Sequence, residues 1–344
     1  MRVDIALEPE YTAAEIAELG ALAERNGITT FWVTNDPQAR DLFMLYTKLA
    51  EATSRIRLGV MAVSPMEIHP IKLAASLHTL NEISNGRAAL VVGAGGAITA
   101  NTRLDMSRRV RAVRECIDIV KRAGGDEPLA YDGEIYPVWN YRLAWADATP
   151  PCVLAGANQA QMLKMSARAA DGIHMSDMPL PLVPNAVQTV ERALATHGRA
   201  NDEFEFNNFW AFHVKRDRRD AELEARTRLV LRGMLKRNYI DPFLSPAEVD
   251  HVREHMPSFY EPFYQREAFY DRGGTFKDVP EPIVDKLVRS LTITASTEEL
   301  DEHLETLRDF AKAGLTHITL GLHDDPADAI RLIGERVIPQ FKTA

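Results

Sequence analysis

The chain has 344 residues, 46% hydrophobic and 26% charged, so it can build a large core and is neither fibrous nor wholly disordered. Its formal net charge of -9 argues against binding to nucleic acid or to anionic membranes, because both require a cationic surface. With only two cysteines, Cys116 and Cys152, and with no secretory signal or membrane-spanning apolar run, we expect a cytoplasmic protein without a disulfide scaffold.

Short apolar runs alternate with segments of helical periodicity along the whole chain. In the helical segments apolar residues recur at spacings of three and four, as in Val110, Val113, Ile117 and Val120. Such alternation indicates parallel strands joined by helical crossovers, and eight such units are typical of an α/β fold closed as a (β/α)8 TIM barrel. An open doubly wound sheet is the alternative. The predicted strands are 3–7, 30–33, 56–63, 88–92, 152–155, 172–175, 204–214 and 317–320.

We expect residues 1–344 to form a single domain with an insertion at 236–290, before the last strand. Prolines, glycines and many aromatic residues interrupt the regular alternation there. Those aromatic side chains would either cover the mouth of the barrel or be buried against the barrel or a second subunit. Another irregular stretch, 124–151, predicts a short hairpin before the fifth strand.

Polar residues and glycines follow most of the predicted strands, at the end of a barrel where active sites lie. Glu8 follows the first strand and would hang over the barrel centre, where partial desolvation favours the protonated carboxyl of a general acid, or else lie in a wet loop. The turn Gly93 to Gly96 exposes backbone amides that would cradle a phosphate or make a plain turn. The other candidates are Asn35, Asp36, Gly156, Ala157, Asn158 and Ser176.

Two further motifs carry weaker signals. Arginines cluster at positions 103, 108, 109, 111 and 114, where they would bind an anion or form a solvated helix face. The stretch from His251 to His255 matches the H-x-x-E-H zinc pattern, but it lies in the irregular segment and has no third ligand at a characteristic spacing. We therefore expect no metal site.

Three stretches together resemble the luciferase-like monooxygenase superfamily, and within it the coenzyme F420-dependent branch that includes methylenetetrahydromethanopterin reductases. The first runs from Ile56 through Asn85-Gly86-Arg87 to Gly96, the second from Gly156 to Gly172, and the third from Ala313 to Pro339. The resemblance implies a bacterial-luciferase-like barrel, with a flavin or deazaflavin ring lying across the carboxyl ends of the strands, and a homodimer.

The resemblance also implies roles for particular residues. A non-proline cis peptide would bulge the third strand behind the ring near Met61 and Ala62, and Asn35 would lie at the cofactor. Glu8 matches an acidic position of the reductases. The residues expected to hold or approach the phosphate-bearing chain of the cofactor are Gly93, Ala94, Gly95, Gly96, Gly156, Ala157, Asn158 and Ser176.

The chain departs from the F420-dependent pattern at two positions. It has Asn35-Asp36 where many members have Asp-His, and Gly96 where several have an acid, which leaves Glu8 and Asp36 as catalytic candidates. The expected activity is hydride transfer between F420 and a small organic substrate. The alternatives are an FMN-dependent monooxygenase, a methylenetetrahydrofolate reductase that uses NADH without a flavin, and a ligand-binding barrel that has lost catalysis.

Overall fold

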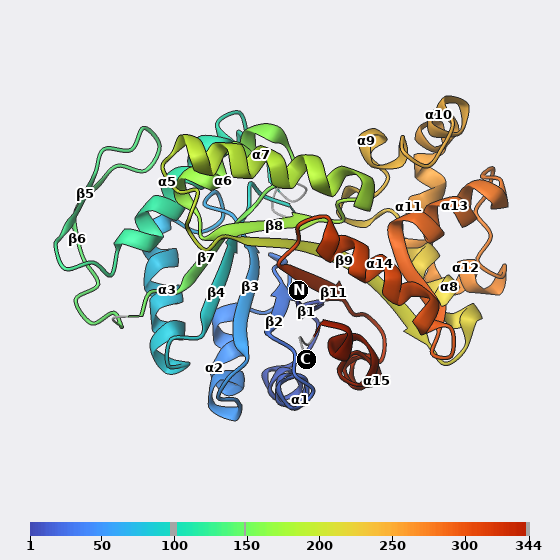
Figure 1. The fold of residues 1–344 in the computed structure, drawn as a ribbon, viewed down its shortest axis with the longest axis horizontal. Coiled ribbons are helices and arrows are strands. Elements are labelled where there is room, and N and C mark those ends of the chain that lie inside the picture. Colours follow the sequence, from blue (N-terminus) through green and yellow to red (C-terminus); the bar gives the residue numbers. More distant parts are fainter. Residues whose placement is uncertain (97–101, 148, 342–344) are drawn as a thin grey trace.

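The protein is a closed barrel of parallel strands surrounded by helices (Figure 1). The computed structural model describes residues 1–96, 102–147 and 149–341. Neighbouring barrel strands pair in the order β1-β2-β3-β4-β7-β8-β9-β11, and the β11–β1 pairing completes the circle. The strands are β1 (Arg2–Leu7), β2 (Thr30–Thr34), β3 (Arg57–Val63), β4 (Ala88–Val92), β7 (Cys152–Gly156), β8 (Gly172–Ser176), β9 (Glu205–Lys215) and β11 (His317–Gly321).

This closure confirms the predicted barrel, and the open doubly wound alternative is wrong. All eight predicted runs are barrel strands, each shifted by no more than a residue or so at its ends. A ninth strand, β10 (Thr292–Ser296), pairs with the second half of β9 outside the closed circle and was not predicted. The hairpin expected within 124–151 is present as antiparallel β5 (Leu129–Tyr131) and β6 (Val138–Tyr141).

Helices cover the outside of the barrel, and their ends follow local sequence signals. Thr12 begins the first helix with a capping box to Glu15, and Asp41 caps the second by accepting from the Met44 amide. The outer helices are α1 (Ala13–Arg25), α2 (Leu42–Ala52), α3 (Pro70–Ile83), α5 (Arg109–Arg122), α6 (Ala160–Ala169), α7 (Val183–Thr196), α8 (Arg218–Arg228), α14 (Leu300–Lys312) and α15 (Pro326–Leu332). None of the helices in the described ranges is both long and apolar enough to cross a bilayer.

The predicted insertion forms a helical layer beside the barrel, at the right of Figure 1. Its helices are α9 (Arg237–Ile240), α10 (Pro246–Glu254), α11 (Met256–Tyr264), α12 (Arg266–Asp271) and α13 (Glu281–Leu291). Phe259, Phe269 and Phe276 are buried together against the inner face of α8, which agrees with the burial alternative for the aromatic residues. Phe263 instead remains half exposed beside the barrel mouth. The insertion boundaries themselves stay a prediction.

A polar network fills the amino-terminal end of the barrel interior. Arg57 donates to Glu205 at 2.8 Å, and Asn207 donates to Asp4 at 2.9 Å. Burial raises the pKa of the Asp4 carboxyl, although His317 and Arg57 act in the opposite direction. With this end occupied by side chains, ligands have access to the barrel from the carboxyl ends of the strands.

Candidate functional site

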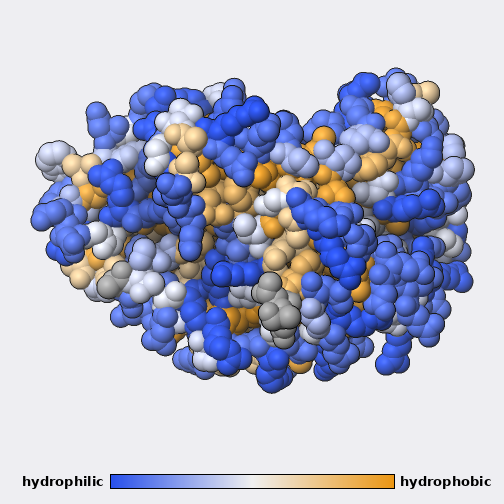
Figure 2. All heavy atoms as spheres, in the orientation of Figure 1, coloured by the Kyte–Doolittle hydropathy of each residue, from blue (hydrophilic) through white to orange (hydrophobic). Residues whose placement is uncertain are grey.

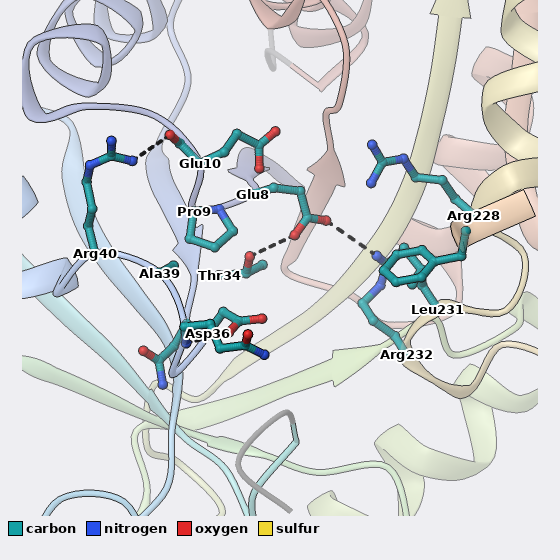
Figure 3. Close-up of a pocket in the computed structure, with 13 residues that line it drawn as sticks. Glu8, Pro9, Glu10, Thr34, Asp36, Ala39, Arg40, Arg228, Leu231 and Arg232 are labelled. Carbon is teal, nitrogen blue, oxygen red and sulfur yellow. Dashed lines mark hydrogen bonds and ion pairs between the residues drawn. The ribbon is translucent and has the colours of Figure 1, made fainter. Parts of the chain in front are cut away.

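Two adjoining cavities lie at the carboxyl ends of the strands. We call the first, of about 500 Å³, the glycine cavity, because Gly93, Gly95, Gly96 and Gly156 line it. The second, of about 750 Å³, is the charged cavity, lined among others by Glu8, Glu10, Asp36, Arg40, Arg228 and Arg232 (Figure 3). Thr34, Asn35 and Arg232 line both cavities, so the two spaces meet at these residues.

A bulge in β3 forms one wall of the glycine cavity. The Met61–Ala62 peptide is cis, as the resemblance implies, and the pairing of β3 with β4 shifts register between Val60 and Val63. The backbone amide of Asn35 donates to the Met61 carbonyl at 2.5 Å, and the backbone amide of Gly93 donates to the Val63 carbonyl at 2.9 Å. A Cβ at position 93 would lie 3.0 Å from the Ala62 Cβ, so a side chain there would crowd the bulge.

The opposite wall comes from β7, β8 and α9. Asn158 donates to the Ser176 carbonyl at 2.7 Å, accepts from the Ser176 amide at 3.0 Å, and bonds to the Tyr239 hydroxyl. Its amide group therefore joins these elements while it lines the cavity. Ala157 does not line the cavity, since it is buried in the core and its amide donates to the His174 carbonyl. The remaining predicted cofactor residues all do.

Cationic side chains stand at the edge of the glycine cavity. Arg109, the first residue of α5, and Lys236 both line it. Two neighbouring arginines, Arg108 and Arg111, instead pair with Glu134 of the hairpin loop. Of the five clustered arginines only Arg109 lines the cavity, where it suits an anionic ligand.

His174 lies beneath the glycine cavity. Its Nε2 is 3.1 Å from the Thr319 hydroxyl, and its ring packs edge-on against Trp32 at 5.3 Å. Burial lowers the pKa of His174 to about 4, so the imidazole is neutral near pH 7.

Glu8 lies in the charged cavity where polar groups converge on its carboxylate (Figure 3). The Thr34 hydroxyl donates to Oε2 at 3.0 Å, and a guanidinium nitrogen of Arg232 lies 4.0 Å from Oε1. The side chain is 23% exposed, which leaves it in contact with the cavity. Glu8 therefore combines a fixed orientation with access to a ligand.

Asp36 lines the same cavity but has a structural partner. Its Oδ1 accepts from the Gln38 amide at 2.8 Å, an interaction typical of a turn. The neighbouring Asn35 points into the glycine cavity and donates to both oxygens of Glu67, at 3.0 and 2.9 Å. Glu67, which the sequence reasoning missed, places a carboxylate in the cavity.

Arg232 is the second residue that the sequence reasoning missed. It has a positive φ of 51° and extends over Phe209, with its guanidinium carbon 4.1 Å from the ring centre. It donates to Asp177 at 2.9 and 3.2 Å, and this fully buried carboxylate raises the pKa of Arg232 against the opposing effect of burial. Arg232 thus places a permanent positive charge in the wall that both cavities share.

The H-x-x-E-H stretch does not gather ligands. His251 bonds to the Asp278 carbonyl and His255 to the His251 carbonyl, and the two rings stack at 4.1 Å. Among the residues that the structure describes, no group of three or more potential ligands is arranged to hold a metal ion.

The family model for luciferase-like monooxygenases matches residues 2–317. The chain belongs to this family. The luciferase-like chain is 27% identical over 347 residues to the 5,10-methylenetetrahydromethanopterin reductase of Archaeoglobus fulgidus, which covers 99% of this chain and 100% of the relative. The reductase of the same name from Methanopyrus kandleri is 25% identical, with 98% of each chain covered.

Solved structures of the family show the same fold. The coenzyme F420-dependent tetrahydromethanopterin reductase of Methanopyrus kandleri superposes with a TM-score of 0.78 at 21% identity, covering 99% of this luciferase-like chain and 100% of its own. An F420-dependent secondary alcohol dehydrogenase, in complex with an F420–acetone adduct, superposes with a TM-score of 0.75 at 16% identity over 100% of both chains.

Proposed function

We propose that this luciferase-like protein is an F420-dependent oxidoreductase that transfers a hydride between the deazaflavin and a small organic substrate. The observation that carries the proposal is the direct junction of the glycine cavity with the charged cavity at Thr34, Asn35 and Arg232. Full-length similarity to methylenetetrahydromethanopterin reductases supports it, since the aligned regions include the residues that line both cavities.

The glycine cavity fits a flat ring with an anionic side chain. Gly93 and Gly156 lie close together, since a Cβ at 156 would lie 3.4 Å from the Gly93 Cα, and neither places a side chain in the cavity. Met61 and Phe209 would contact the ring, while Arg109 and Lys236 would bind phosphate or carboxylate groups of the side chain. A bound reduced deazaflavin supplies a two-electron hydride donor.

The charged cavity would hold the substrate beside Glu8. Thr34 orients the Glu8 carboxylate through Oε2, which leaves Oε1 toward Arg232 and the cavity. We assign Glu8 the proton that accompanies hydride transfer, because it is held and accessible, and keep Asp36 as the second candidate. Phe263 of α11 lines the outer side of the cavity and would help to exclude water.

The test is a titration of the purified apoprotein with F420, FMN and NADH, in which cofactor fluorescence is followed. We expect saturable quenching of F420 that is lost when Arg109 and Lys236 are both replaced by alanine. Tight FMN binding with indifference to F420 would favour the monooxygenase alternative, and binding of NADH alone would favour the flavin-free reductase. Binding of none of the three would support a barrel without this chemistry.

Two further features belong to the proposal. We infer a homodimer, in keeping with the resemblance, which sedimentation equilibrium would test. We also infer a cytoplasmic location, because Cys116 and Cys152 are free thiols; Cys116 is buried in the core and Cys152 bonds weakly to Arg57.

A further inference from the structure

A buried histidine lies next to Glu8 without belonging to either cavity lining. His323 follows β11, its side chain is 1% exposed, and its Nδ1 is 3.6 Å from Glu8 Oε1. That distance is too long for a formed hydrogen bond. Within the described ranges, neither ring nitrogen of His323 has a hydrogen-bond partner. A buried imidazole in this condition is costly unless another state of the site satisfies it.

The orientation of the His323 ring is set by a second buried histidine. His213 of β9 stacks on it with ring centres 5.3 Å apart and planes 16° from parallel. Nδ1 of His213 lies 2.7 Å from Glu224 Oε1, and Glu224 Oε2 is 2.9 Å from Lys215 Nζ. Since Glu224 fixes His213, the stacking holds the plane of the His323 ring, and within that plane Nδ1 is the ring nitrogen that lies near Glu8 Oε1.

The surroundings keep His323 neutral. Burial lowers the pKa of His323 well below its usual value, and neighbouring cations lower it further. A neutral imidazole can donate one hydrogen bond to a carboxylate without cancelling its charge, whereas an imidazolium would neutralise it. The charged and titratable groups around His323 are Glu8 just after β1, Arg228 and Glu224 of α8, Arg232, and His213 and Lys215 of β9.

We propose that neutral His323 is a positioning residue for Glu8. When substrate binding brings the two side chains closer than 3.6 Å, the Nδ1–H of His323 donates to Glu8 Oε1 and holds the carboxylate for proton exchange. This inference rests on the proposed function of Glu8. It adds Glu224 and His213 as the supports that hold the donor in place. Proton transfer itself stays between Glu8 and the substrate or solvent in the charged cavity.

Three substitutions at one position separate this role from simple packing. His323→Phe keeps the stacked ring but removes both nitrogens, while asparagine places its amide nitrogen near Nδ1 and glutamine places it near Nε2. We expect His323→Phe to lower kcat by roughly 10- to 100-fold with unchanged F420 affinity, His323→Asn to recover part of the loss, and His323→Gln to recover none. His197→Asn, at an exposed histidine that ends α7, is the matched control.

A second measurement does not depend on turnover. The infrared carboxyl band that Glu8→Gln removes can be titrated with pH in the unliganded protein and with a bound substrate analogue. In the bound form, His323→Phe should raise the midpoint of this band by about one pH unit, because a donor to the ionised form is lost. In the Glu8→Gln background, His323→Phe should change kcat less than twofold.

The outcomes distinguish the two proposals. An unchanged infrared midpoint in His323→Phe, full rescue by glutamine, or multiplicative losses with Glu8→Gln would each overturn the role of His323. Absence of F420 turnover in the wild-type protein would overturn the proposed function, whereas an unchanged infrared midpoint in a protein that does turn over F420 would overturn the role of His323 alone. If His323→Phe does not fold, the asparagine and glutamine variants carry the same comparison.

Discussion

The guanidinium of Arg232 is stacked on Phe209 at 4.1 Å and donates two hydrogen bonds to the Asp177 carboxylate. This arrangement fixes a cation between the glycine cavity and the charged cavity, 4.0 Å from Glu8. On the face of the molecule drawn in Figure 2, hydrophilic residues surround the margin and hydrophobic ones gather toward the middle.

Replacement of Arg232 by alanine should lower both stability and activity. Asp177 would remain as a buried carboxylate without its partner, which costs about 3–5 kcal/mol in free energy of unfolding. Urea denaturation measures this loss. Arg237→Ala removes a side chain that is 50% exposed, and should have little effect. Equal stability of the two variants would show that the Arg232–Asp177 pair carries no such stabilisation.

Glycine at position 93 should strengthen cofactor binding. In Gly93→Ala the new methyl group meets the Ala62 Cβ at 3.0 Å and pushes the β3 bulge, so we expect weaker F420 binding by fluorescence titration. The double variant Gly93→Ala with Ala62→Gly removes the opposing methyl group and should regain most of the affinity. Failure of this rescue would place the effect of Gly93 elsewhere.

Replacing Asn35 by aspartate should weaken cofactor binding, because it would place a negative charge beside Glu67. Asn35→Asp would set a second acid against Glu67, which now accepts two hydrogen bonds from the amide. We expect the affinity for anionic F420 to fall by roughly tenfold or more through like-charge repulsion. Adding Glu67→Gln to this variant should restore F420 binding in the fluorescence titration. If binding is not restored, repulsion between the two carboxylates is not the cause.

The two acids of the charged cavity should differ in importance. Glu8→Gln should reduce the rate of hydride transfer by roughly two to four decades in single-turnover absorbance measurements, because the proton would have no positioned carrier. Asp36 is engaged by the Gln38 amide, and asparagine can accept the same bond. Asp36→Asn should therefore retain most of the rate; the reverse order would assign the proton to Asp36.

Much of this pattern was accessible from the sequence, for physical reasons. The eight barrel strands are short apolar runs with a helical period between them, and the glycine turn is a local feature. The bulge at Met61 and Ala62 was expected only from the family resemblance. The strand β10 alternates threonine with small and apolar residues, so its burial was hidden. Arg232 meets Asp177 across 55 residues and His323 meets Glu8 from the opposite end of the chain, and no periodicity encodes such contacts.

Acid should destabilise the protein through its buried neutral histidines. His174 has a folded pKa of about 4, lowered by burial from 6.5, so the unfolded chain binds more protons between those values. Stability therefore falls as pH drops from 6.5 toward 4, by at most about 1.4 kcal/mol per pH unit for this group. His174→Gln should flatten urea-derived stability in that window. Glu224, with its pKa held at about 2 against burial by His213 and Lys215, adds a loss only below its usual value of 4.5.

The long strand β9 supports two different parts of the molecule. Its first half closes the barrel against β8 and β11, and its second half carries β10 and the helical layer that contributes Phe263 to the charged cavity. Substitutions in that layer can change the charged cavity beside Glu8 without altering the part of the glycine cavity that is built on β3, β4 and β7. The two sides of the candidate site therefore rest on different parts of the sheet.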